Sequence, residues 1–214
     1  MSQPAHAAHW YFDFISPFSY LQLRKVREWH TRLAITPVPI AFGAVLKAHG
    51  QLGPAEVPGK REFTYRFVQW QAEQMGVPMR FPPTHPFNPL TALRLCIAAG
   101  TTWESIQAIF DHIWRDGGDG AGASGLASVA AALGIADVDA ATAAVAVKNQ
   151  LRANTDSALA AGVFGVPTLR IGDELFWGND ATPMVEQWLA DPQRFDSAEY
   201  RRIAGLPVGV QRTR

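Results

Sequence analysis

Strand-like sequence is confined to the two ends of this chain, and a long helical stretch separates them. The first strand signal is Trp10–Ile15, which is short, aromatic and bounded by turn-forming residues. We expect an amphipathic helix from Pro17 to about Leu33, with Ser16 as its N-cap. A second strand, Ile35–Phe42, is expected to run parallel to the first. The chain therefore opens with a βαβ unit.

Residues 43–161 change to a helical spacing of apolar side chains, which predicts a large helical block. Three linkers interrupt it: residues 50–59, the proline-rich residues 81–89, and the Gly/Ala-rich residues 117–125, which we expect to be mobile. The helical spacing is clear in two sets of residues: Phe63, Phe67 and Trp70, and then Trp103, Ile106, Phe110 and Ile113.

Strand signals return near the end of the chain. Thr168–Ile171 and Glu174–Trp177 flank a two-residue turn, and Thr182–Leu189 is expected to form a closing helix. The order βαβ, helical block, ββα predicts an α/β fold with a thioredoxin-like sheet and a large inserted helical domain. We expect a discontinuous thioredoxin-like domain (residues 8–42 and 162–190), a helical domain (residues 43–161) and a C-terminal tail (residues 191–214) that packs on the domain or is exposed.

Charge and cysteine usage narrow the possible partners and the cellular compartment. Nineteen basic and nineteen acidic residues cancel, which argues against nucleic acid or a membrane as the main partner and leaves a small neutral or mildly acidic ligand open. The single cysteine, Cys96, is expected to be a core residue, and it excludes an intramolecular disulfide. Residues 1–9 do not resemble a secretory signal, and no apolar run is long enough to span a membrane, so we expect a cytoplasmic protein.

Metal and phosphate sites find no support in the sequence. The six histidines show no ligand-like spacing, so no metal site is predicted. The glycine-rich residues 117–125 follow a helix and lack the lysine and the strand context of a phosphate-binding loop.

Ser16 and Ser19 stand at the start of the first helix, where thioredoxin-like oxidoreductases carry two cysteines. Ser16 is either a simple helix cap or a group that binds the thiolate of another molecule. A hydroxyl cannot carry dithiol redox chemistry, but a hydroxyl donor and a helix N-terminus together could lower a thiol pKa from about 8.5 to about 6.5, roughly 2.7 kcal/mol. Glutathione is the obvious diffusible thiol of a cytoplasm.

Val166 and Pro167 come just before the third strand signal. A proline there is commonly an edge or turn residue. In a thioredoxin-like fold, however, this loop normally holds a cis-proline, and the residue before it can pair its backbone with an extended peptide. Val166 is therefore expected to bind the cysteinyl part of glutathione.

Trp177, Gly178, Asn179 and Asp180 form the third candidate segment. Asn179 and Asp180 are either a helix cap or part of a binding site. The γ-glutamyl end of glutathione carries an ammonium group, which Asp180 could pair, and a carboxylate, which suits free N–H groups at a helix start.

Taken together, the segments Tyr11–Leu21, Phe164–Thr168 and Trp177–Asp180 resemble the 2-hydroxychromene-2-carboxylate isomerase family. That family is related to kappa-class glutathione transferases and, more distantly, to DsbA-type oxidoreductases. The resemblance covers nearly the whole chain. It implies a homodimer and glutathione-dependent cis-trans isomerisation of a small aromatic carboxylate, through thiolate addition, bond rotation and elimination.

The resemblance also suggests residues on the substrate side. Lys47, after a one-residue gap, matches a lysine that binds the substrate carboxylate, although a solvated helix lysine is the alternative. Gln51 replaces an asparagine frequent in the family. His85 takes the place of a tyrosine that faces the aromatic ring, with a polar surface histidine as the alternative. Two other functions stay open: a kappa-like glutathione transferase and a non-catalytic thioredoxin-fold binding protein.

Overall fold

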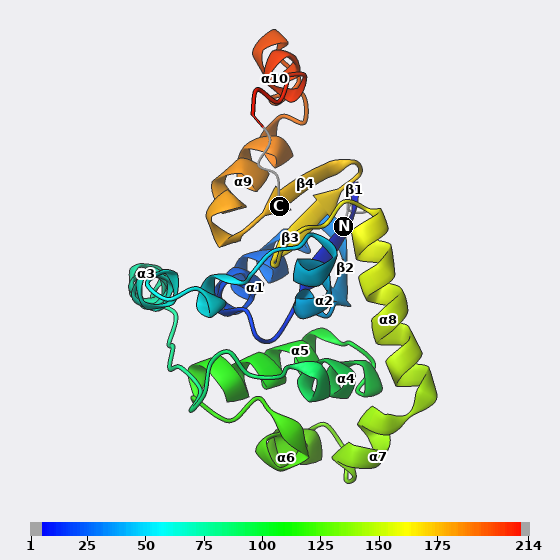
Figure 1. Cartoon of the computed structure of the whole chain (residues 1–214). Helices are drawn as coiled ribbons and strands as arrows, with labels where there is room; N and C mark the ends of the chain where they lie inside the picture. The colour runs from blue at the N-terminus through cyan, green and yellow to red at the C-terminus, as the bar shows by residue number, and fades with distance from the viewer. Residues whose placement is uncertain (1–5, 211–214) are drawn as a thin grey trace.

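A four-stranded sheet with the strand order β2-β1-β3-β4 forms the centre of the molecule (Figure 1). The computed structural model describes residues 6–210. Strand β1 pairs in parallel with β2 and antiparallel with β3, and β3 pairs antiparallel with β4. The predicted parallel pairing of the first two strands is therefore confirmed. The strands are β1 (His6–Phe12), β2 (Leu33–Pro39), β3 (Thr168–Ile171) and β4 (Glu174–Trp177).

Helix α1 (Pro17–Trp29) begins where the sequence predicts and ends earlier than expected. Ser16 is its N-cap, and Pro17 occupies the first helical position, where its missing N–H costs nothing. The helix stops at Trp29 because the chain turns there and Leu33 already begins β2.

Between β2 and β3 the chain forms a series of helices joined by loops. Helix α8 leaves the helical block and runs back to the sheet, where it contacts both α2 and β2 (Figure 1). The elements of this segment are α2 (Phe42–Ala48), η1 (Pro54–Glu56), α3 (Lys60–Met75), α4 (Leu90–Ala98), α5 (Trp103–Phe110), the π-helical turn η2 (Asp111–Arg115), α6 (Gly122–Ala132), α7 (Val138–Ala143) and α8 (Val145–Ala160).

Three further boundaries differ from the prediction. Strand β1 ends at Phe12 rather than Ile15, because the Asp13 carboxylate accepts the N–H of Ile15 and turns the chain. Phe42 begins α2 instead of closing β2. Residues 122–125, expected to belong to a linker, form the first turn of α6.

Two hydrophobic clusters cover the two faces of the sheet, as the alternation of side chains along β1 requires. Trp10 and Phe12 belong to the larger cluster, where their rings stack 4.5 Å apart. Tyr11, between them in sequence, belongs to the smaller cluster, which also contains Val45 of α2 and Val166. Cys96 is fully buried in the larger cluster, as expected.

The C-terminal part closes the sheet and then leaves it. Residues 172–173 form the predicted turn between β3 and β4, and the predicted closing helix is α9 (Thr182–Ala190), preceded by η3 (Asn179–Ala181). Helix α10 (Ala198–Ala204) projects from the body of the molecule (Figure 1) and is exposed along its length. Arg212 and Arg214 of the predicted tail lie outside the described residues. No helix between residues 6 and 210 is long and apolar enough to cross a membrane.

Candidate active site

Ser16 lies at the N-terminus of α1 and is only 6% exposed. Its Oγ accepts the backbone N–H of Ser19 at 3.2 Å, which confirms the predicted cap. The hydroxyl still has its own proton to donate, and no hydrogen bond among residues 6–210 uses that proton. Capping the helix and donating to a ligand are therefore compatible roles for one side chain.

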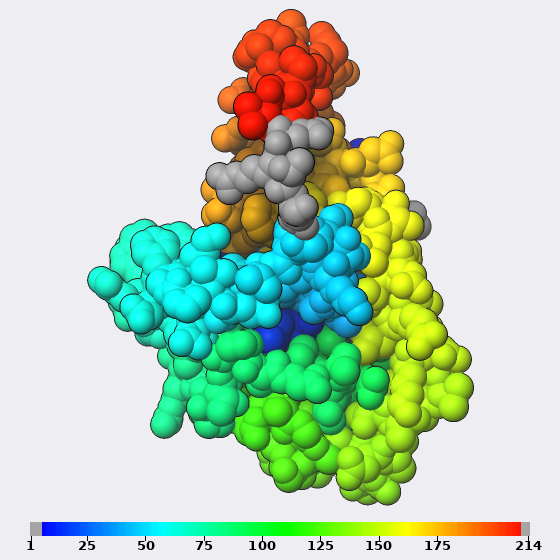
Figure 2. Space-filling model, in the orientation of Figure 1, coloured from blue at the N-terminus to red at the C-terminus, as the bar shows by residue number. Residues whose placement is uncertain are grey.

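Part of the N-terminal segment of the chain reaches the surface between α2 and the helical block. Figure 2 shows a small deep-blue area, from the earliest part of the chain, between the light-blue region of α2 and the green helices of the insertion. Ser19, the second serine of the pair, has a buried Oγ without a hydrogen-bond partner among the described residues. Because Ser19 is 0% exposed, this unpaired hydroxyl is a cost to the fold and is not open to a ligand.

The loop before β3 has the predicted backbone form. The Val166–Pro167 peptide bond is cis. No hydrogen bond among residues 6–210 uses the N–H or C=O of Val166, so both groups are available to an added strand. Two bonds fix the loop: the Thr168 hydroxyl donates to Gly165 C=O at 2.8 Å, and Gly178 N–H donates to Pro167 C=O at 2.8 Å.

Trp177 and Gly178 occupy tightly constrained positions beside this loop. The Trp177 ring is 54% exposed and covers Gly165, where a Cβ would lie 2.3 Å from its Nε1 atom. Gly178 has a φ of 93°, and a Cβ there would lie 2.3 Å from Asp180 Oδ1. Its backbone conformation favours glycine at Gly178, where the missing Cβ leaves room for the Asp180 carboxylate, whereas a Cβ at Gly165 would displace the Trp177 ring.

Asn179 and Asp180 do not cap α9, so that alternative is wrong. The N-cap of α9 is Ala181, without a side-chain cap bond, and the Thr182 hydroxyl donates to Asn179 C=O at 2.6 Å. Asn179 is buried, and its Oδ1 has no partner among the described residues. Asp180 is exposed. An open acceptor and an exposed carboxylate thus lie next to each other in the chain.

A buried glutamine joins α1 to this turn. Trp10 Nε1 donates to Gln22 Oε1 at 2.8 Å, and Gln22 Nε2 donates to Gly178 C=O at 2.9 Å. Because Gly178 also bonds Pro167, the helix that Ser16 begins, the cis-proline loop and the Gly178–Asp180 turn form one connected unit. Gln22 was not predicted from the sequence. The one sign of it is a polar residue on the face of α1 that is otherwise buried.

The three substrate-side residues lie on separate elements. Lys47 is exposed in the last turn of α2, and Gln51 is exposed just after it. His85 is half-buried in the loop after α3, and both ring nitrogens are engaged: Nε2 lies 2.9 Å from Ile15 C=O, and Nδ1 lies 2.7 Å from the Tyr65 hydroxyl. Only the faces and edges of this ring remain for a substrate. Contact of any of the three with substrate stays a prediction.

Asp13 is the ionisable group that sequence analysis overlooked. It is fully buried, and its two oxygens accept Ile15 N–H at 3.1 Å and Phe42 N–H at 2.9 Å. The second bond supplies a cap to α2, whose own N-cap residue is an alanine. Burial raises the pKa of this carboxyl to about 7, although its backbone donors lower it.

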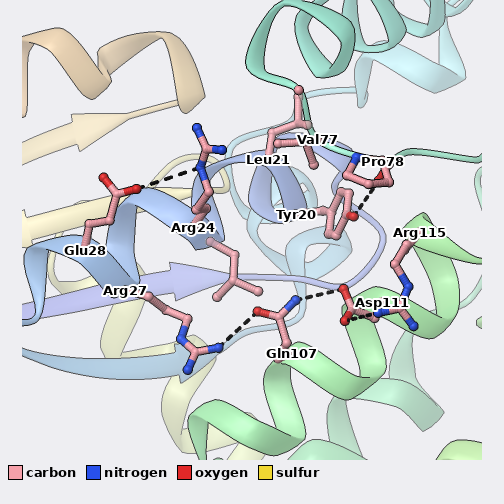
Figure 3. A pocket seen from close by; sticks show the side chains of 12 residues that line it. Tyr20, Leu21, Arg24, Arg27, Glu28, Val77, Pro78, Gln107, Asp111 and Arg115 are labelled. Atoms are coloured by element: carbon pink, nitrogen blue, oxygen red, sulfur yellow. Dashed lines mark hydrogen bonds and ion pairs between the residues drawn. The ribbon is translucent and has the colours of Figure 1, made fainter.

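A crevice of about 540 Å³ lies beside α1, between the loop after α3 and the end of α5 (Figure 3). Its polar groups largely pair with one another: the Tyr20 hydroxyl donates to Pro78 C=O, Arg27 to Gln107, and Arg115 to Asp111. None of the predicted site residues lines it. Among residues 6–210, no cluster of three or more His, Cys, Asp or Glu side chains could hold a metal ion.

The fold and the site define a thioredoxin-fold protein without redox cysteines, since its one cysteine is buried and serines stand at the start of α1. The family model for the DSBA-like thioredoxin domain matches residues 9–190. The chain therefore belongs to the DsbA-like thioredoxin family.

Two kinds of enzyme are among the proteins to which the chain is similar. The chain is 31% identical to 2-hydroxychromene-2-carboxylate isomerase of Sphingobium xenophagum, covering 85% of this chain and 96% of the relative. It is 27% identical to glutathione S-transferase kappa 2 of Caenorhabditis elegans, covering 85% and 91%. A solved structure of 2-hydroxychromene-2-carboxylate isomerase superimposes with a TM-score of 0.75 at 28% identity, covering 89% and 97%. Over most of its length the chain is thus similar to isomerases and to kappa-class transferases, which supports an enzyme of the DsbA-like family.

Proposed function

We propose that this protein is a glutathione-dependent isomerase that converts 2-hydroxychromene-2-carboxylate, or a related aromatic intermediate, to its trans ring-opened form. For the parent compound the product is trans-o-hydroxybenzylidenepyruvate. The observation that carries the proposal is Ser16, a buried hydroxyl with a free proton at the start of α1. The named isomerase relatives support the choice of reaction. We further infer a homodimer, as the family resemblance implies, and a cytoplasmic location, as expected from residues 1–9 and the single cysteine.

The unpaired groups of the site fit glutathione. The N–H and C=O of Val166 suit its cysteinyl backbone, next to Pro167. The Asp180 carboxylate can pair with the charge of the γ-glutamyl ammonium, and the buried, unpaired Oδ1 of Asn179 beside it can serve as a further acceptor. Trp177 and Gly178 form the wall and the turn that hold these groups in place.

The chain's own residues would control the state of the sulfur. The Ser16 hydroxyl donates to it, and the N-terminus of α1 adds a partial positive charge that favours an anion. When bound, glutathione supplies the nucleophile, whose thiolate adds to the conjugated double bond, permits rotation and leaves again. Lys47 would hold the substrate carboxylate, while Gln51 and His85 would contact the remainder of the substrate.

The alternative is a kappa-like glutathione transferase, which the Caenorhabditis elegans relative favours. Both enzymes need the same thiolate site and differ in the fate of the thiol. An isomerase returns it, so a small amount of glutathione should support many turnovers with free thiol constant. A transferase consumes one glutathione for each product molecule and leaves a stable thioether.

The decisive experiment supplies 2-hydroxychromene-2-carboxylate in large excess over glutathione and follows both product and free thiol. We expect full conversion with no loss of thiol. Stoichiometric loss of thiol, with a thioether in the mass spectrum, would assign the protein to the transferases. Glutathione binding without turnover of either kind would leave only a binding protein.

Two variants test the assigned roles. Ser16→Ala should remove the ultraviolet thiolate absorbance of bound glutathione at neutral pH and lower turnover. Lys47→Ala should lower activity without changing glutathione affinity, because positioning of the reacting atoms contributes several kcal/mol. Lys148→Ala, which changes an exposed lysine on α8, is the matched control. An unchanged thiolate signal in Ser16→Ala would leave that serine a helix cap only.

A further inference from the structure

The chain just before Ser16 is held by side chains from three different places. We call residues 13–16 the Ser16 turn. Within it, Phe14 C=O accepts Trp114 Nε1–H at 2.8 Å, Ile15 N–H donates to Asp13 Oδ1 at 3.1 Å, and Ile15 C=O lies 2.9 Å from His85 Nε2. Three polar backbone groups in succession thus bind side chains rather than water or a strand neighbour.

Trp114 comes from the π-helical turn η2. This turn follows α5 directly and carries one more residue than an α-helical turn, so it re-aims the side chains that follow. Trp114 is fully buried, and its own C=O accepts Arg80 N–H at 2.7 Å, which ties the turn to the loop after α3. π-Helical turns are frequent at functional sites. Here the turn presents an indole N–H to the Ser16 turn.

His85 comes from the loop after α3, and its partners fix its tautomer. A carbonyl only accepts, so the proton must be on Nε2, which donates to Ile15 C=O. In the neutral ring, Nδ1 is then an acceptor. It lies 2.7 Å from the Tyr65 hydroxyl, whose single proton is shared with the backbone C=O of His85, also at 2.7 Å. Burial lowers the pKa of His85, which favours this neutral form. The ring also packs edge-on against Trp114, with ring centres 5.4 Å apart, so the two donors support each other.

We propose that His85 and Trp114 are positioning residues through which the inserted helical segment sets the anion-stabilising geometry at Ser16. They donate hydrogen bonds to the carbonyl oxygens of Phe14 and Ile15, so these oxygens point away from the anion site. The same bonds fix the direction in which the Ser16 hydroxyl and the first N–H groups of α1 point. Stabilisation of an anion depends on donors that are already oriented. The inference rests on the proposed function, since the anion is the glutathione thiolate.

The test compares variants that remove or retain each N–H donor. His85→Leu removes the donor to Ile15, whereas His85→Gln keeps an N–H group. Trp114→Phe keeps an aromatic ring but removes the indole N–H and part of the buried ring volume, a loss that the control at the equally buried Trp29 shares. Trp29→Phe is the matched control, because it removes an indole N–H bond to Glu186, 2.6 Å long, at the far end of the same helix.

Thiolate absorbance of bound glutathione, titrated against pH, is the first readout. We expect His85→Leu and Trp114→Phe to raise the thiolate pKa enough to reduce the ionised fraction near neutral pH by roughly three-fold to ten-fold. The calorimetric glutathione affinity should stay within about three-fold, because Val166 and Asp180 are untouched. His85→Gln and Trp29→Phe should titrate like the wild type. Unchanged titrations in His85→Leu and Trp114→Phe would overturn the proposal.

Amide hydrogen exchange is the second readout and needs no glutathione. Loss of either donor should accelerate exchange at Ile15, Ser16 and Ser19, while Trp29→Phe should leave these amides protected. If the wild type fails to bind glutathione, the proposed function fails, and exchange alone decides whether His85 and Trp114 hold the Ser16 turn. Unchanged exchange rates in both His85→Leu and Trp114→Phe would show that these side chains do not stabilise the Ser16 turn. If His85→Leu does not fold, Trp114→Phe and His85→Gln carry the comparison.

Discussion

At the scale of single residues, Asp13 is a carboxyl group buried without a cationic partner. Its oxygens bind two backbone N–H groups, and among its surroundings no charged side chain contributes to its pKa. Such a group is expensive to ionise in a protein interior. The Asp13 carboxylate offsets this cost with hydrogen bonds that an apolar side chain could not make. These bonds join the Ser16 turn to the start of α2.

Asp13 predicts how stability changes with pH. Its pKa in the folded protein, about 7, lies above the ordinary 3.8, so its contribution is fully present below about pH 4 and is lost as pH rises through 7. The difference corresponds to the order of 4 kcal/mol. Asp13→Asn should therefore lose stability relative to the wild type at pH 4–5 and regain it by pH 8.

Urea unfolding at several pH values measures this effect. The wild-type free energy of unfolding should fall more steeply between pH 4 and 7 than that of Asp13→Asn. Asp173→Asn changes an exposed carboxylate at the hairpin turn and should give a profile parallel to the wild type. Parallel profiles for Asp13→Asn as well would mean that Asp13 does not titrate as a buried acid.

Asp180 makes a second prediction, about affinity. If its carboxylate pairs with the γ-glutamyl ammonium, Asp180→Ala loses a charge-assisted bond of about 1.5–3 kcal/mol. The glutathione dissociation constant should rise roughly ten-fold to a hundred-fold in calorimetric titration. Asp173→Ala, which removes an exposed charge nearby in sequence, should leave it unchanged. Equal affinities of Asp180→Ala and wild type would exclude Asp180 from the site.

At the scale of elements, α1 is fixed at both ends. Its N-terminal end depends on the Ser16 turn. Near its C-terminal end, Trp29 Nε1 donates to Glu186 Oε1 of α9 at 2.6 Å, and Arg32 pairs with the other oxygen at 2.9 Å. Because Trp29 is buried, its bond matters more than the exposed ion pair. Glu186 therefore docks α9 onto the end of α1.

Glu186→Ala should destabilise the protein by about 1–3 kcal/mol, because it leaves a buried indole N–H without its partner. Glu186→Gln keeps an acceptor and should cost less. Glu28→Ala removes an exposed pairing with Arg24 and Lys25 and should change stability by no more than about 0.5 kcal/mol. Thermal unfolding ranks the three variants. A Glu186→Ala protein as stable as Glu28→Ala would contradict the docking role.

At the scale of the whole molecule, what the sequence predicted well is local. The hairpin around residues 172–173 and the start of α1 depend on neighbouring residues, so turn and capping rules find them. The family resemblance then gave the fold and the cis-proline loop. The links between distant segments were not predictable: Gln22 to Gly178, Asp13 to Phe42 and His85 to Ile15. The residues next to a polar side chain in the sequence do not indicate which distant residue it will bond in the folded protein.

The insertion between β2 and β3 has a consequence for the nascent chain on the ribosome. Strand β1 is synthesised about 150 residues before its neighbour β3. Translation of the intervening residues takes roughly ten to thirty seconds. Until then one edge of β1 has no partner strand. Val166, Gly178 and Asp180 also emerge at the end, after Ser16 has long left the tunnel. A prematurely terminated product therefore carries the serine and none of the surface that would hold the tripeptide beside it.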